Sequence, residues 1–318
     1  MKLFIRKETK LNEYRTPLIP SDCKKLIDKG FKIIVESSDC RCFSDEEYKS
    51  CGCIISNYEE GYLVVGLKEL GDDFYYGCRN MYFSHSFKGQ MNSGEILGRF
   101  RESGGVIYDY EYIVGEDGRR SIAFGFWAGF VGCFLGLYQF KYGNLSNLRY
   151  WGNYMDLLDE LGDIQLGIKI GIIGINGRCG GGCRYLLDLL KIGYKGYCRD
   201  DKLDSSHDIL INCIYLSPDS GVVFIDDNNV DSVRVLVDVS CDIYAENNPI
   251  RIEYPLTNYD RPVYRYRDTD IIAIDNLPSL LPRDSSEEFS NKLVDLLNDE
   301  TLNKLECIYR DKLLDYCW

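Results

Sequence analysis

The sequence is short of positive charge and contains almost no histidine. Its 318 residues include 37 lysine and arginine against 50 aspartate and glutamate, a formal net charge of −13, and only 2 histidines. Nucleic acids and anionic membrane surfaces bind proteins through clustered positive charges, so we expect neither as a partner. This balance still allows a local cationic pocket for a small molecule.

The chain also lacks a long, unbroken apolar run. Its apolar segments at 122–138 and 166–175 contain glycine and are too short or too broken to span a bilayer. The start, MKLFIRKETK, has no long apolar stretch of the kind that signal peptides carry. We therefore expect a cytoplasmic protein. The 45% apolar and 27% charged fractions are typical of a soluble globular chain.

Cysteine, by contrast, is abundant, with 14 residues. Without a secretory signal, we expect reduced thiols and small core side chains. The densest group, Cys40, Cys42, Cys51 and Cys53, lies in CRCFSDEEYKSCGC. Four thiolates can bind zinc, but the paired Cys-x-Cys spacing differs from the usual Cys-x2-4-Cys. We expect no metal, and a zinc site is the alternative.

Short apolar runs alternate with helix signals along the first part of the chain. This alternation predicts an α/β fold with a parallel sheet. The predicted strands cover 2–8, 31–38, 62–70 and 106–114, and the predicted helices cover 21–30 and 44–52, both with serine as the cap, and 93–105. The long, apolar, glycine-spaced segment 124–140 predicts a buried helix that connects two lobes.

A second α/β unit opens with an apolar strand over 169–174. A glycine-rich turn follows, then an amphipathic helix over 179–191 and a short strand that ends near Asp200. Further strands are predicted over 208–216 and 233–240, and the tail is predicted to be helical through Trp318.

The turn GINGRCGGG matches the pattern G-x-x-G-x-x-G through Gly174, Gly177 and Gly180. It follows a predicted strand and opens a predicted helix, which is the context that dinucleotide binding requires. Glycines let the backbone approach a pyrophosphate, and the helix N-terminus offers free N–H groups. A carboxylate after the next strand would bind the ribose, with Asp200 favoured over Asp201, and would repel a 2′-phosphate. The pattern therefore favours NAD over NADP, and a purely structural glycine turn is the alternative.

Together these segments resemble the NAD-dependent, lysine-forming saccharopine dehydrogenases, almost from end to end. The motifs that recur in order are RKETK, NEYR, VVGLKEL, YFSHSFKGQ, GRRSIAFGFWAGFVG, IIGINGRCGGG, INCIYLS, LVDVS and IDNLPSLLPRDSSEEFS. The resemblance implies two Rossmann-like domains with parallel sheets and the active site in the interdomain cleft. The substrate domain would cover 1–130 and 284–318, and the NAD-binding domain 131–283. It also implies a monomer that cleaves saccharopine oxidatively to lysine and 2-oxoglutarate, with NAD as cofactor.

The same resemblance implies residue roles. Lys68 looks like the base that deprotonates the substrate amine, and His85 like the acid–base group that hydrolyses the imine. The implied substrate contacts are Arg15, Lys68, Gln90, Arg120, Phe124 and Ser240. The implied cofactor contacts are Arg119, Gly177, Arg178, Asp200, Tyr215, Val239, Ile274, Asp275, Asn276 and Leu277. Cys179 and Cys213 hold positions where relatives can form a disulfide, so they are a candidate redox pair, kept as thiols in the cytosol.

The chemistry asks for these residue types. Saccharopine carries three carboxylates, and guanidinium groups bind carboxylates bidentately, which favours Arg15 and the Arg119–Arg120 pair. Taken alone, that pair indicates a solvated turn. A lysine accepts a proton at neutral pH only if burial or nearby cations lower its pKa. Read alone, Lys68 would be an exposed loop lysine.

Imidazole titrates in the range that imine hydrolysis needs. His85 follows a short apolar strand 17 residues after Lys68, so a parallel sheet would present both side chains at one carboxyl edge. Alone, His85 would be a packing histidine. The second histidine, His207, lies in the polar segment DSSHD, and we expect it at the surface.

Two features depart from the family pattern. The chain is shorter than its relatives between 140 and 168, and the segment 264–270, YRYRDTD, replaces a small-residue segment. Two other functions therefore stay open beside the main one. These are an alanine dehydrogenase-like enzyme and a catalytically silent, NAD-binding regulatory protein.

Overall fold

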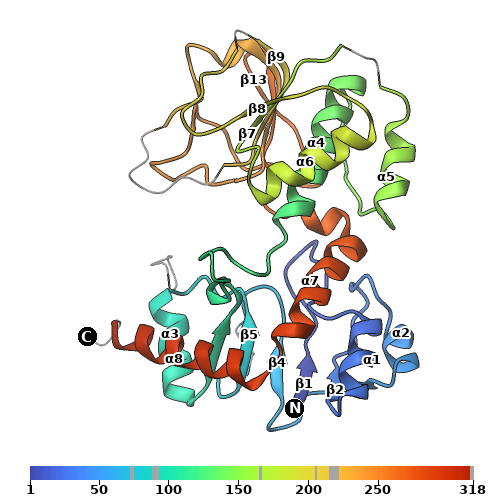
Figure 1. Ribbon diagram of the computed structural model, residues 1–318, viewed down its shortest axis with the longest axis vertical. Coiled ribbons are helices and arrows are strands. Elements are labelled where there is room, and N and C mark those ends of the chain that lie inside the picture. The colour runs from blue at the N-terminus through green and yellow to red at the C-terminus, as the bar shows by residue number, and fades with distance from the viewer. Residues whose placement is uncertain (72–74, 88–92, 165–166, 205, 215–221, 316–318) are drawn as a thin grey trace. The chain divides into compact units, whose positions relative to one another are not determined.

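The computed structural model describes residues 1–318 except 72–74, 88–92, 165–166, 205, 215–221 and 316–318 (Figure 1). The chain divides into two compact units, which we call the first unit (1–123 and 282–318) and the second unit (124–281). The boundary expected after residue 130 falls inside helix α4 (Gly125–Tyr142), which belongs entirely to the second unit because it packs on that unit's sheet.

The first unit is built on a fully parallel sheet with the strand order β3-β2-β1-β4-β5-β6. The strands are β1 (Lys2–Ile5), β2 (Lys32–Val35), β3 (Ile54–Ile55), β4 (Leu63–Val65), β5 (Arg79–Tyr82) and β6 (Val106–Asp109). The helices are α1 (Pro20–Asp28), α2 (Asp45–Ser50), α3 (Ser93–Ser103), α7 (Pro282–Leu296) and α8 (Asp299–Asp315), with a 3-10 turn η1 (Tyr110–Tyr112). The order reverses between β1 and β4, and open α/β sheets bind ligands beyond the carboxyl ends at such a reversal.

The two predicted serine caps have different outcomes. Ser44 caps α2 and forms a reciprocal capping box with Glu47, as predicted. The prediction for α1 is wrong, because that helix begins at Pro20, and Ile19 takes the cap position without a side-chain hydrogen bond. Proline suits the first helical position because its fixed φ is already helical and its missing N–H would have no partner there.

The second unit carries a sheet with the order β13-β14-β11-β9-β7-β8. All neighbours are parallel except β13, which runs antiparallel to β14. The strands are β7 (Ile170–Ile173), β8 (Lys195–Tyr197), β9 (His207–Asn212), β11 (Val233–Asp238), β13 (Tyr264–Tyr266) and β14 (Thr269–Ile272). The segment YRYRDTD thus forms an edge hairpin. The other elements are α5 (Tyr154–Leu161), α6 (Arg178–Leu189), the turns η2 (Val230–Ser232) and η3 (Leu277–Leu280), and the small pair β10 (Ile225–Asp226) and β12 (Ile250–Arg251).

Helices α4 and α6 lie side by side in the second unit (Figure 1). Their contact depends on two glycines. A Cβ atom at Gly129 would overlap the backbone of Cys179, and one at Gly182 would overlap the backbone of Phe126. The backbones therefore approach more closely than any side chain would permit. This confirms the prediction that the glycine-spaced segment 124–140 is a buried helix, and it shows why its glycines recur.

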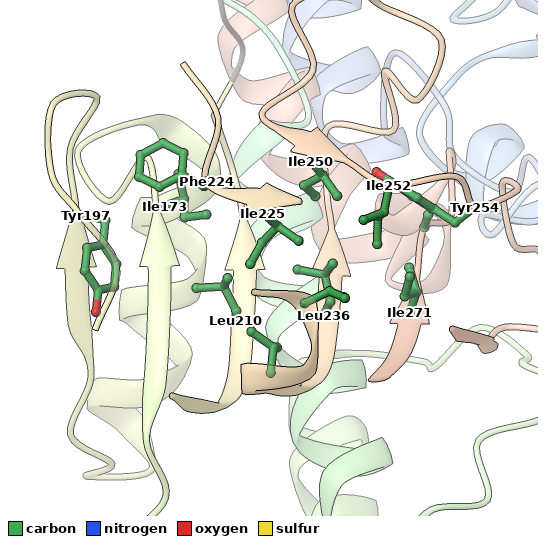
Figure 2. Packing of buried hydrophobic residues seen from close by; sticks show 13 residues of the cluster. Ile173, Tyr197, Leu210, Phe224, Ile225, Leu236, Ile250, Ile252, Tyr254 and Ile271 are labelled. Carbon is green, nitrogen blue, oxygen red and sulfur yellow. The ribbon is translucent and has the colours of Figure 1, made fainter. Parts of the chain in front are cut away.

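A large apolar cluster covers part of the same sheet. Figure 2 shows Leu210, Leu236 and Ile271 from neighbouring strands of the sheet packed beneath Ile225 and Ile250, which belong to the small β10–β12 pair. All five side chains are at most 2% exposed. The segment that contains β10 and β12 thus covers the sheet where a helix would do so in a more regular α/β unit.

The prediction for His207 is wrong. It is the first residue of β9 and is only 4% exposed, and its Nε2 atom lies 2.8 Å from the hydroxyl oxygen of Tyr197. Space for the ring comes from Gly171, where a Cβ atom would lie 2.7 Å from the imidazole. The polar segment before His207 suggested an exposed position, but the parallel pairing with β11, in which His207 lies opposite Val233, carries the residue into the sheet.

This buried histidine predicts a pH dependence of stability. Burial lowers the pKa of His207, with Asp204 acting against the shift. The folded state therefore binds fewer protons than the unfolded state, in which the pKa is about 6.5. The contribution to stability is complete above that pH and is lost as the pH falls toward the folded pKa. We expect the melting temperature to fall as the pH is lowered from about 7.5 to about 5.5, the range in which histidine titrates. His207→Gln should make this fall smaller.

Thermal denaturation of the full chain at several pH values measures this slope. The matched control is His85→Gln, which removes the other histidine and should retain the wild-type slope. An unchanged slope in His207→Gln would contradict the assignment.

In the described part of the chain, none of the helices combines the length and apolar character needed to cross a membrane.

Candidate active site

Charged side chains gather at the carboxyl edge of the sheet in the first unit. Lys68 lies three residues after β4, and His85 lies three residues after β5. The two strands pair in parallel, and the pairing continues beyond their ends, because the Phe83 N–H donates to the Leu67 carbonyl oxygen at 3.1 Å. The prediction that Lys68 and His85 follow neighbouring strands to one edge is confirmed.

His85 lies between two carboxylates. Its Nε2 atom is 3.8 Å from Oε1 of Glu69, and its Nδ1 atom is 3.6 Å from Oε1 of Glu111. The backbone is left-handed, with φ 54°, a conformation that non-glycine residues rarely adopt and that is enriched at functional sites. The side chain is 32% exposed. His85 is therefore an accessible imidazole beside two acids, and the alternative of a packing histidine is wrong.

The backbone of Lys68 is held by a buried ion pair. Glu8 accepts hydrogen bonds from the amides of Leu67 at 2.7 Å and Lys68 at 3.0 Å, and Arg6 donates to the Lys68 carbonyl oxygen. Lys68 itself is half-buried, unlike an ordinary exposed loop lysine. Burial raises the pKa of the Glu8 carboxyl, with the Arg6 charge acting against the shift.

Arg15 is engaged by a neighbour in the chain. Its Nε and Nη2 atoms donate to the two carboxylate oxygens of Glu13 at 2.7 and 2.5 Å, and both residues are at most 4% exposed. Burial alone would raise the pKa of Glu13, but Arg15, with a smaller contribution from Lys68, outweighs burial and lowers it. A carboxylate ligand of Arg15 would therefore have to share the guanidinium with Glu13.

The two arginines that follow β6 have different surroundings. The Nη1 atom of Arg120 lies 3.2 Å from Oε1 of Glu111, so Arg120 belongs to the group around His85. Arg119 is 82% exposed and lies 3.9 Å from Asp117 in the turn. Within the first unit, the structure thus brings Arg120 to the edge and leaves Arg119 in a solvated turn.

The glycine turn of the second unit fits a pyrophosphate. Gly174 follows β7 with φ 79°, and Gly177 is the N-cap of α6, with no side-chain cap of its own. A Cβ atom at Gly180 would lie 2.5 Å from the Gly174 carbonyl oxygen. The turn therefore needs small residues, and the N-terminus of α6 faces it with its N–H groups, the arrangement that accepts a dinucleotide phosphate. Arg178, the first residue of α6, is exposed.

The structure separates the two candidate ribose ligands. Asp201 accepts a hydrogen bond from the Cys198 amide at 2.6 Å, which closes the turn after β8. Asp200 is exposed three residues beyond the end of β8. The geometry favours Asp200, as the sequence does.

The other cofactor candidates follow β11 and β14. Val239 and Ser240 come directly after β11. The Ser240 hydroxyl donates to the buried carboxylate of Asp238 at 2.7 Å. Tyr259 donates to the carbonyl oxygen of Asn276, which belongs to the run Ile274, Asp275, Asn276 and Leu277 after β14. Because β7, β9, β11 and β14 are parallel, these segments share the edge that carries the glycine turn.

Three predicted contacts stay untested. Gln90 and Tyr215 lie outside the described residues. Phe124 is the N-cap residue of α4 and is half-buried. Their roles stay predictions.

Cys213 has a cysteine beside it that the sequence did not indicate. The sulfur of Cys213 lies 3.6 Å from that of Cys183, and the sulfur of Cys179 lies against Gly125. All three are thiols in the structure. The candidate redox pair Cys179–Cys213 stays a prediction, and Cys183, one helical turn further along α6, is a second candidate partner for Cys213.

The cysteine-rich segment does not assemble into one group. Cys53 contacts the buried Cys23, while Cys40 is exposed. Within the described ranges, no cluster of three or more histidine, cysteine, aspartate or glutamate side chains could hold a metal ion.

Arg6 and Glu8 were missed by sequence reasoning, although both lie in the motif RKETK. Their spacing carried a signal, because residues two apart on an extended chain point to the same side. The motif served only to identify the family, and nothing in it indicated which backbone groups the two charges would hold.

Comparisons with known proteins agree with this geometry. Residues 4–131 match the alanine dehydrogenase/PNT N-terminal domain, and residues 201–316 match the alanine dehydrogenase/PNT C-terminal domain. The saccharopine dehydrogenase [NAD(+), L-lysine-forming] of Yarrowia lipolytica is 33% identical over 92% of this chain and 90% of its own. The enzyme of the same name from Schizosaccharomyces pombe is 33% identical over 92% and 91%. A solved L-alanine dehydrogenase has the same fold, with a TM-score of 0.73, 16% identity and complete coverage of both chains. The chain belongs to the family of NAD(+)-dependent, L-lysine-forming saccharopine dehydrogenases.

Proposed function

We propose that this protein cleaves saccharopine oxidatively to lysine and 2-oxoglutarate, with NAD as the oxidant. The observation that carries the proposal is the placement of Lys68 and His85 after neighbouring parallel strands, beside the reversal of strand order in the first unit. Family membership over nine tenths of the relatives' length supports the same reaction. The balanced reaction consumes saccharopine, water and NAD⁺ and yields lysine, 2-oxoglutarate, NADH and a proton.

Lys68 would act first, as the base. Hydride leaves a carbon next to nitrogen, so the secondary amine must lose its proton to expose the lone pair that forms the imine. Lys68 is half-buried and its backbone is fixed. The neutral amine of Lys68 takes the proton, and NAD supplies the hydride acceptor.

His85 would act on the imine. Water adds to the imine carbon as His85 removes its proton, and the resulting carbinolamine splits when the nitrogen receives a proton. One imidazole can serve both steps because it accepts and then returns a proton near neutral pH. Glu69 and Glu111 lie 3.8 and 3.6 Å from its two nitrogens, so the ring faces a carboxylate on either side.

The binding of both ligands rests on groups at the two sheet edges. Arg15, Arg120 and Ser240 are the described polar candidates for the substrate, and the family resemblance adds Gln90 and Phe124. For NAD, the turn from Gly174 to Gly180 would hold the pyrophosphate, and Asp200 would accept hydrogen bonds from the ribose. A carboxylate at that position disfavours the 2′-phosphate of NADP. We propose that the enzyme is monomeric and cytoplasmic and acts on small molecules.

One assay separates this function from the alternatives. NADH oxidation is measured with lysine plus 2-oxoglutarate and, separately, with pyruvate plus ammonia. We expect turnover only with the first pair. Turnover with pyruvate plus ammonia would indicate an alanine dehydrogenase, and NADH binding without turnover with either pair would indicate a silent regulatory protein.

A further inference from the structure

We propose that Arg6 and Glu8 are positioning residues that hold the backbone N–H and carbonyl of Lys68 and so direct its side-chain amine toward the substrate. This inference rests on the proposed role of Lys68 as the base.

The two side chains form hydrogen bonds with both the amide and the carbonyl of Lys68. One oxygen of Glu8 accepts from the Leu67 amide at 2.7 Å and the other accepts from the Lys68 amide at 3.0 Å. Arg6 donates through Nη2 to the Lys68 carbonyl oxygen. Arg6 also pairs with Glu8, with 3.1 Å between Nη1 and Oε2. Because the amide and carbonyl of one residue are both held, its Cα–Cβ direction is fixed.

The pair does this in a buried position. The side chains of Arg6 and Glu8 are 2% and 4% exposed. Removing two charges from water is costly, and apolar residues of similar volume often stabilise a protein as well or better. Fold stability is therefore a weak explanation for this pair, and the specific hydrogen bonds to residues 67 and 68 are a stronger one.

The chain makes room for the pair at Gly66. A Cβ atom there would overlap the guanidinium of Arg6. Gly66 continues β4, since its amide donates to the Met81 carbonyl oxygen. The strand thus packs directly against the guanidinium, and the amides of Leu67 and Lys68 that follow contact the ion pair.

The orientation of the Lys68 side chain matters because a carboxylate lies near it. The positive charge of Lys68 contributes to the lowered pKa of Glu13, which also pairs with Arg15. If the backbone at Lys68 could rotate, the ammonium could pair with Glu13 and turn away from the substrate amine. A displacement of about 1 Å in a reacting group can lower the rate about 10²-fold.

The test is Glu8→Gln in the full chain. The amide replaces one acceptor oxygen with a donor, so one of the two N–H groups loses its partner. We expect kcat with lysine plus 2-oxoglutarate to fall about 10²-fold, with an unchanged Kd for NADH. The apparent pKa in the kcat–pH profile should move by about half a unit or more, since the surroundings of the base change.

Two further variants separate positioning from folding. Replacing both charges, as Arg6→Met with Glu8→Leu, leaves no buried charge unpaired, although the amides of Leu67 and Lys68 and the Lys68 carbonyl lose these partners. We expect this variant to unfold cooperatively, with a melting temperature no lower than that of Glu8→Gln, while kcat stays low. Glu95→Gln is the matched control, because it breaks an exposed pair with Arg99 on α3 and should leave kcat and its pH profile unchanged.

Hydrogen exchange provides a readout that does not need activity. In Glu8→Gln we expect faster amide exchange at residue 67 or 68, whichever loses its acceptor, with the rest of the first unit still protected. If wild-type protein shows no turnover, the proposed function fails. Hydrogen exchange still tests whether Glu8 holds the backbone at residues 67 and 68. Unchanged exchange and an unchanged pH profile in folded Glu8→Gln would overturn the inference, as would faster exchange throughout the unit.

Discussion

Replacing Lys68 by methionine is expected to lower kcat by about 10²–10⁴-fold, the scale of a positioned acid or base. Methionine fills a similar volume but has no proton acceptor of the required strength. NADH should still bind, because the glycine turn and Asp200, which we propose as its ligands, lie in the other unit. Steady-state NADH oxidation with lysine plus 2-oxoglutarate measures kcat, and fluorescence titration measures NADH binding.

Lys68→Arg tells a base from a simple positive charge. Arginine keeps the charge and the reach, but its guanidinium stays protonated and so cannot accept a proton. We therefore expect it to be as impaired as methionine, whereas substantial activity in Lys68→Arg would mean that only the charge matters. Lys24→Met removes an exposed lysine of α1 that pairs with Asp28 and should behave as wild type.

Replacing His85 by glutamine is expected to lower turnover by a similar factor, about 10²–10⁴-fold, but at a different step. Glutamine can form hydrogen bonds but does not titrate, so hydrolysis of the imine should become slow while its formation persists. With saccharopine and NAD⁺, we expect a rapid burst of NADH followed by a slow steady rate. Stopped-flow absorbance would record both phases, and Lys68→Met should show no burst.

The control for His85 is the other histidine. His207→Gln changes a buried side chain bonded to Tyr197 in the second unit, so the steady rate should change little in protein that remains folded. A His85→Gln variant with wild-type turnover would remove the imidazole from the mechanism. A loss of the burst together with the steady rate would assign His85 to the first step as well.

The local pattern of the sequence predicted most of the elements that position the site. The strand before Lys68, the strand before His85 and the glycine turn before α6 all occur where apolar runs meet polar residues or glycine. These predictions succeed because strand burial and turn formation depend on neighbours a few residues away. The parallel pairing of β4 and β5 then followed from a general rule about such alternation.

The partners of the charged residues were not predictable in this way. The sequence did not indicate that Arg15 pairs with Glu13. It suggested a surface position for His207, which is buried. It did not indicate that Cys183 lies beside Cys213. Each of these neighbours depends on how strands and helices pack.

The sequence by itself determined the order of the strands and helices, the glycine turn and the family, because these depend on short-range periodicity and on motifs in a fixed order. Only the tertiary structure decided which charges meet. It brought Glu8, which follows β1, to the amides of Leu67 and Lys68, and Glu111 to His85. Electrostatic and hydrogen-bond interactions act over a few ångströms of space, and residues some sixty positions apart reach that range only when the sheet has formed.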